Sequence, residues 1–163
     1  MNRFFTPEHL HAAVNHLPLI GLCAACIPLL YGVLRKQTEV LVVAFLMCVL
    51  FGGSMALVMK SGEEAEERFE KQPVSSMLDA GGKAALDQHE NQAKLAAIPA
   101  YATAALGLLG LVVLWRRPSW KLYCGWLTLV AALVAIGLML RTADSGGQIR
   151  HPEFRSTIEV KHQ

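Results

Sequence analysis

The chain has 163 residues, of which 53% are hydrophobic and only 17% are charged, and its mean hydropathy is +0.37. This composition excludes an ordinary soluble domain and predicts an integral membrane protein. The net charge of +2 does not indicate a nucleic-acid-binding surface. The chain also has no phosphate-binding loop, nucleophile elbow or metalloprotease signature.

The first predicted element is a short helix that leads into a membrane-length window. Thr6-Pro7-Glu8 is typical of an N-cap, a proline at the first helical position and an acid in the first turn. Pro18 and Pro28 both fall in this first window, and each should kink its helix. The first kink should lie just beyond His16. The alternative for this end of the chain is a cleaved signal peptide, although the apolar run is longer than is typical of one.

Four windows reach the roughly 20 apolar residues that a helix needs to cross a membrane. They cover residues 13–34, 40–59, 95–115 and 122–140, and their length and lack of alternating polarity favour helices over membrane strands. We expect an all-α, antiparallel four-helix membrane bundle that forms a single domain over residues 1–163. The four cysteines all lie inside these windows, where packing is a more ordinary role than disulfide formation.

The segment between the second and third windows, residues 60–92, is charged and predicts further helix. Ser61-Gly62 followed by acids is typical of a capped helix start, and after Gly81-Gly82 a helical pattern runs through His89 into the third window. In the tail, residues 141–163, Gly146-Gly147 predicts a tight turn that would return His151 toward the bundle mouth.

Lysine and arginine predict the orientation, because they accumulate in cytoplasmic loops. They occur in the two short connections, as Arg35, Lys36, Arg116, Arg117 and Lys121. Both termini and the segment 60–92 should then face the periplasm, in a bacterial inner membrane.

Six histidines occur, and none lies in the middle of an apolar window. Antiparallel threading would gather them at one end of the bundle, which is a layout typical of a metal or haem site. His16 opens the first window and His89 approaches the third, so they are the preferred axial ligands of a haem. His11 would not share a helical face with His16 and could serve a different centre, such as a second haem held with His151.

Small residues on the expected helix faces would leave room for a flat macrocycle, and they would equally allow close helix packing. Arg141 and Arg150 could pair with haem propionates, although Arg141 could equally be an interfacial anchor. Because Cys23-Ala24-Ala25-Cys26 is not followed by histidine, any haem should be non-covalent and of b type. Few carboxylates are expected inside the bundle, which also favours haem over a bare metal ion.

The chain resembles a family of small bacterial four-span membrane proteins of unknown function. That family tends to carry a His-Pro-x-x-x-His-Phe-Pro pattern, a histidine at the head of the third helix, and Gly-Gly before a further histidine. Here the corresponding segments are His11 to Pro18, His89, and Gly146-Gly147 before His151, with Ala12 and Leu17 departing from the pattern. The arrangement is also similar in kind to the paired histidines of membrane cytochromes b.

The leading hypothesis is a lipid-embedded b-type cytochrome with one or two haems. It would pass electrons from a quinol or another membrane donor to a periplasmic cytochrome or redox subunit. A second hypothesis is a copper or zinc protein that uses the same four histidines, with Met55 and Met59 as possible soft ligands. A third is a non-catalytic membrane subunit whose charged segment 63–71 docks a partner.

Overall fold

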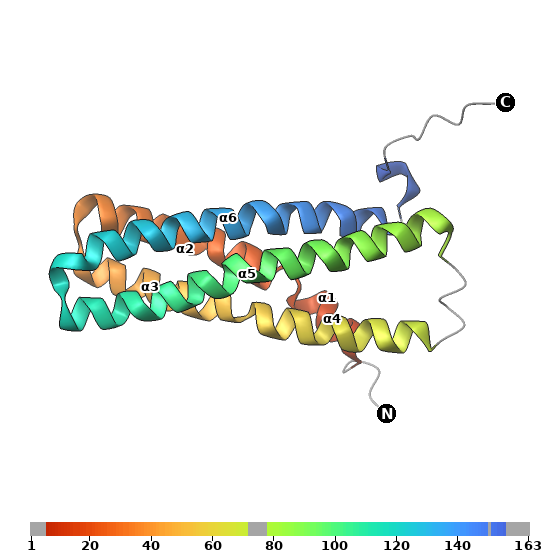
Figure 1. Ribbon diagram of the computed structural model, residues 1–163, viewed down its shortest axis with the longest axis horizontal. Helices are drawn as coiled ribbons and strands as arrows, with labels where there is room; N and C mark the ends of the chain where they lie inside the picture. Colours follow the sequence, from red (N-terminus) through yellow and green to blue (C-terminus); the bar gives the residue numbers. More distant parts are fainter. Residues whose placement is uncertain (1–5, 72–77, 150, 156–163) are drawn as a thin grey trace.

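The computed structural model describes residues 6–71, 78–149 and 151–155, and these residues form helices with no strand. The helices are α1 (Pro7–Val14), α2 (Leu17–Arg35), α3 (Thr38–Gly53), α4 (Met55–Glu70), α5 (Ala80–Arg116) and α6 (Lys121–Gln148), with short 3-10 helices η3 (Pro118–Trp120) and η4 (Pro152–Phe154). Long antiparallel helices form one bundle, with α1 packed beside α4 (Figure 1). The all-α four-helix bundle is therefore confirmed.

The two ends of the bundle differ in construction. One end, here called the turn end, holds the short connections from α2 to α3 and from α5 to α6 (Figure 1). At the turn end Lys36 adopts a left-handed conformation with φ of 56° and closes α2. The opposite end, here called the cavity end, holds α1, the end of α4, the start of α5 and the end of α6 (Figure 1).

The N-terminal helix begins as the sequence predicts, but the kink lies elsewhere. The Thr6 side chain accepts a hydrogen bond from the His9 backbone N–H and so caps α1. The chain then breaks at Asn15 and His16, before Pro18 and not beyond His16. Pro18 lies in the first turn of α2, where the missing N–H would have no helical partner in any case. The break therefore replaces the predicted kink.

The second apolar window is divided at Ser54, and its helix extends much further than the window. Helix α3 ends at Gly53, and α4 runs on through the charged sequence to Glu70. The predicted helix start at Ser61 is wrong, because Ser61 is buried inside α4 and its hydroxyl donates to the Val58 carbonyl at 3.1 Å. Serine in mid-helix can bond to its own preceding turn instead of capping a new helix.

The predicted turn at Gly146-Gly147 is also wrong. Helix α6 continues through both glycines to Gln148, and His151 follows beyond the helix end. Glycine permits a turn without requiring one. Neither glycine has a positive φ, so another reason must account for the small residue at position 146, and the packing described below supplies it.

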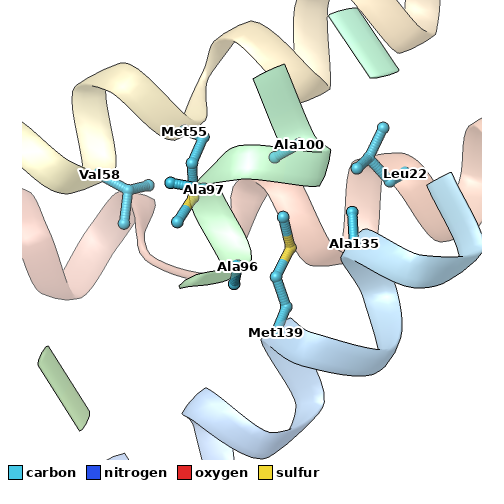
Figure 2. Packing of buried hydrophobic residues seen from close by; sticks show 8 residues of the cluster. All are labelled: Leu22, Met55, Val58, Ala96, Ala97, Ala100, Ala135 and Met139. Carbon is cyan, nitrogen blue, oxygen red and sulfur yellow. The ribbon is translucent and has the colours of Figure 1, made fainter. Parts of the chain in front are cut away.

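The core consists of two clusters stacked along the bundle. The cluster nearer the turn end is built around Phe45, whose ring and backbone face Gly110 and Gly107 of α5. The cluster nearer the cavity end contains Leu22, Met55, Val58, Ala96, Ala97, Ala100, Ala135 and Met139. Figure 2 shows Met55 and Met139 extending from different helices toward the small alanines of α5. Alanine and glycine let the helices approach closely, as is usual for membrane bundles.

The outer surface is apolar. Ile27 is 73% exposed, Ile98 is 66% exposed and Leu50 is 64% exposed. Four helical segments, covering residues 7–35, 38–68, 80–116 and 118–148, are long and apolar enough to cross a membrane. Such a continuous apolar exterior is typical of a surface that contacts lipid. All four cysteines are free thiols, as their positions in the windows predict.

Candidate functional site

A cavity of about 630 Å³ opens at the cavity end of the bundle and is lined by residues of α1, α2, α4, α5 and α6. Three of the four histidines predicted as ligands line it, namely His11, His16 and His89. Its floor includes Met55, Val58, Ala96 and Met139 of the cluster in Figure 2. A volume in this range is typical of pockets for cofactors and other small molecules.

His89 lies on α5, and its ring is held against α6. Its Nδ1 lies 2.8 Å from the backbone carbonyl oxygen of Thr142. Because a carbonyl oxygen can only accept, Nδ1 must carry the hydrogen and donate it. The neutral ring then has its lone pair on Nε2. Imidazoles that bind metals are commonly oriented in this way, by donating the other ring N–H to a backbone carbonyl.

His11 lies on α1, and its ring is held against α4 in the same manner. Its Nδ1 lies 3.2 Å from the Val58 carbonyl oxygen and 3.2 Å from the Ser61 hydroxyl. By the same argument Nδ1 donates to the carbonyl, which leaves Nε2 with the lone pair. The position of His11 is thus fixed by a helix that is 47 residues away in the sequence.

A serine and a glycine shape each histidine contact. Ser145 donates to the Thr142 carbonyl at 2.9 Å, as Ser61 donates to that of Val58. A Cβ added to Gly62 would lie 3.1 Å from Cε1 of His11, and a Cβ added to Gly146 would lie 3.0 Å from Cε1 of His89. Each imidazole therefore lies close to bare helix backbone, where a Cβ would force the ring to shift.

Sequence reasoning missed these serines and glycines as parts of the site. It interpreted Ser61-Gly62 as a helix start and Gly146-Gly147 as a turn. The available signal was the Ser-Gly dipeptide, which occurs at 61–62 and again at 145–146, late in each half of the chain. A glycine inside a helical pattern often has a packing or functional reason.

His16 lines the same cavity but is held differently. It precedes α2 as the N-cap residue, its side chain makes no capping hydrogen bond, and it is exposed. Next to it, the side-chain oxygen of Asn15 is buried and has no hydrogen-bond partner within the described chain. Because Asn15 also lines the cavity, this oxygen is an acceptor that a bound molecule or water could satisfy.

Carboxylates are more numerous around the cavity than the sequence predicts. Glu8, Glu63, Glu66 and Glu90 line it, and Lys94 is the basic residue among the lining residues. Arg68 pairs with Glu8 at 3.5 Å, and Lys94 pairs with Glu90. The prediction of few carboxylates concerned the inside of the bundle, whereas these four line a cavity at its end.

The remaining predicted ligands lie outside this cavity or outside the described residues. His151 is exposed, and its Nδ1 contacts Glu153 at 2.9 Å. It does not line the cavity, because α6 continues where a turn was expected. Arg141 is exposed on α6 and does not line the cavity either. Arg150 lies outside the residues that the structure describes.

Arg155, which follows the short helix η4, joins the start of α5 to the end of α6. The Arg155 guanidinium donates to both carboxylate oxygens of Asp79, at 2.9 and 2.7 Å, and to the carbonyls of Gln148 and Ile149. Arg155 thereby joins the residue that caps α5 to the end of α6. Because Ile149 lines the cavity, this contact helps to define one wall.

The arrangement supplies few ligands for a bare metal ion. In the described parts of the chain, no group of three or more His, Cys, Asp or Glu side chains is placed to hold one. Haem iron takes four of its six ligands from the porphyrin, so two imidazoles suffice. No family model, curated protein or solved structure matches this chain, so the resemblance to the four-span family stays a prediction.

Proposed function

We propose that this protein is a membrane-anchored b-type cytochrome that binds haem in the cavity lined by His11, His16 and His89. The observation that carries the proposal is the pair of imidazoles, His11 and His89, whose Nδ1 atoms contact backbone carbonyls in a cavity of about 630 Å³. In each ring the lone pair on Nε2 would then be available to coordinate a metal such as haem iron. Alanine and methionine side chains form an apolar floor, as a porphyrin ring requires.

The residues around the cavity fit this group. The glycine contacts keep both rings in defined positions, and the apolar floor excludes water from one side. Haem, when bound, would supply one-electron transfer, and burial and axial ligation would determine its potential. Among the lining residues Lys94 could pair with a propionate, in the role that the sequence assigned to Arg141. The carboxylates of the mouth would leave the other propionate to solvent.

In the proposed setting the four helices span a bacterial inner membrane with the cavity end toward the periplasm. The basic residues of the turn end support this orientation, because Arg35, Lys36, Arg116 and Arg117 would then be cytoplasmic. Both termini would be periplasmic. A quinol or another membrane donor would supply electrons, and a periplasmic redox partner would accept them at the cavity mouth.

The test is a haem assay on the full-length protein purified from membranes in detergent. We expect reduced-minus-oxidised haem bands and about one non-covalent haem per chain. His89→Ala should lose most of the haem, whereas His9→Ala should retain it, because His9 bonds to Thr6 and does not line the cavity. Wild-type protein that lacks haem and does not take up added haemin would refute the proposal.

Copper or zinc binding is the alternative, and a non-catalytic subunit is the third possibility. A bare ion would need ligands beyond His11 and His89, and the described residues hold no preformed group of three. Met55 and Met59 line the cavity and could contribute only to a soft ion such as copper. Metal analysis of haem-free protein separates these alternatives. Stoichiometric copper or zinc would support a metal-binding protein, and its absence would support a non-catalytic subunit.

A further inference from the structure

The helices in the two halves of the chain are buried at corresponding positions. When α2 is shifted by 78 residues it falls on α5, and most buried positions coincide. The coinciding buried pairs are Pro18/Ala96, Leu22/Ala100, Ala25/Thr103, Leu29/Gly107 and Gly32/Gly110. The residue types differ, so the match lies in which positions face the core.

The second helix of each half shows the same relation with a shift of 84 residues. This shift carries α3 and the first part of α4, through Glu64, onto α6, and again most buried positions coincide. The coinciding buried pairs are Leu41/Gly125, Ala44/Thr128, Phe45/Leu129, Cys48/Ala132, Met55/Met139 and Ser61/Ser145. Figure 2 shows Met55 and Met139, which this register relates, on opposite sides of the alanines of α5.

The packing of the helices agrees with two related hairpins. In the first half α2 packs against α3, and in the second half α5 packs against α6. Between the halves, α3 packs against α5 and α2 packs against α6. These two cross-contacts are exchanged by an approximate two-fold axis along the bundle. Parallel repeats about such an axis, along the membrane normal, are a recurring architecture of membrane proteins.

The histidine contacts obey the same two shifts. His11 shifted by 78 is His89, and Val58, Ser61 and Gly62 shifted by 84 are Thr142, Ser145 and Gly146. In both halves the histidine Nδ1 donates to the carbonyl three residues before the serine, and the ring lies on the glycine after it. His16 shifted by 78 is Lys94, so His16 has no histidine counterpart.

We propose that the chain is a tandem duplication of one helical hairpin, and that each copy supplies one equivalent axial ligand, His11 and His89. The two imidazoles, which line the same cavity, would together hold one haem. Ser61-Gly62 and Ser145-Gly146 act as positioning residues for these ligands. This inference rests on the proposed function, and its ligand pair differs from the pair His16 and His89 that the sequence alone favours.

Methionine substitution tests the ligand pair. Replacing one of two axial histidines by methionine gives His/Met ligation, which raises the midpoint potential and changes the absorption spectrum. We expect His11→Met and His89→Met to shift the potential upward by similar amounts. His9→Met should leave both potential and spectrum unchanged, because His9 does not line the cavity, and His16→Met should keep the wild-type absorption spectrum because His16 is not a ligand. A shift for His16→Met with none for His11→Met would overturn the inference while leaving the proposed function intact.

Alanine variants guard against methionine failing to ligate. His11→Ala and His89→Ala should each lose haem, and added imidazole should restore the wild-type spectrum in both by occupying the vacated space. Rescue of only one variant would contradict equivalence of the two ligands. Wild-type protein without any haem would overturn both the ligand pair and the proposed function, so the two failures remain distinguishable.

A measurement without haem tests the positioning directly. Side-chain ¹⁵N NMR of the apoprotein distinguishes the two neutral imidazole tautomers. We expect His11 and His89 both to carry the hydrogen on Nδ1, and Ser61→Ala and Ser145→Ala to weaken that preference at His11 and His89 respectively. An Nε2–H tautomer at either histidine in the wild-type apoprotein would overturn the inference.

Discussion

The glycines beneath the two histidines allow a prediction that separates ligand positioning from stability. In Gly62→Ala the new Cβ would lie 3.1 Å from Cε1 and 3.3 Å from Nδ1 of His11. In Gly146→Ala both corresponding distances to His89 are 3.0 Å. Because ordinary carbon contacts are longer than this, each ring must move by a few tenths of an ångström.

The expected cost falls on binding more than on folding. A displaced ring lengthens its Nδ1 hydrogen bond to Val58 or Thr142, whose loss costs about 0.5–1.5 kcal/mol. Alanine in place of glycine in a helix interior contributes about 1 kcal/mol in the opposite direction. Global stability should therefore change little. Haem affinity should fall by roughly 10–100-fold, which is the usual effect of removing an orienting contact behind a metal ligand.

The assay is haem titration of detergent-purified apoprotein, with thermal unfolding measured on the same samples. Gly53→Ala and Gly137→Ala are matched controls, because a Cβ at either position meets no atom within 4 Å. The controls should keep wild-type haem affinity and gain a little stability. Unchanged affinity in both Gly62→Ala and Gly146→Ala would refute the argument that the bare helix backbone positions the imidazoles.

Two further predictions concern the core and the C-terminal contact. Gly107→Ala should destabilise the bundle by about 1–3 kcal/mol, because the added Cβ would lie 2.9 Å from the Phe45 carbonyl oxygen, and a thermal shift equal to wild type would contradict this. Hydrogen bonding from Arg155 holds the pKa of Asp79 below its ordinary value. The stabilisation from this contact is therefore present above the ordinary carboxyl pKa and is lost as pH falls through the lowered pKa. The protection of the Gly82 amide, which donates to Asp79, should fall over that acidic range in wild type when its exchange rate is compared with the intrinsic rate at each pH. In Asp79→Ala, which removes the acceptor, this protection should be low at every pH, and equal protection in the two proteins would argue against the contact.

The fold could be predicted from the sequence because its main determinants are local. The apolar windows are long enough to require helices, and the cap at Thr6 was recognisable from three residues. The helix ends were harder to predict, because serine and glycine have several structural uses. At Ser61 and Gly146 the sequence pattern favoured a cap and a turn. In the structure both residues lie inside helices and contact a histidine ring.

The site was predicted in part. Antiparallel threading correctly placed His11, His16 and His89 around one cavity, because it depends only on which end of each window they occupy. The difference between His16 and the other two could not be predicted, since it depends on backbone carbonyls supplied by distant helices. Those carbonyls belong to Val58 and Thr142, residues whose side chains carry no sign of that role.

The length of α5 has a consequence for where electrons could go. Its 37 residues span about 55 Å, whereas the hydrocarbon core of a bilayer is about 30 Å thick. Measured from Arg116, His89 lies about 40 Å along the helix. In the proposed orientation it therefore lies about 10 Å outside the hydrocarbon core, among the lipid headgroups. A redox centre at that height would be reachable sideways by a lipid-soluble donor and from above by a water-soluble acceptor. It would be far too distant from the cytoplasmic surface to exchange electrons there.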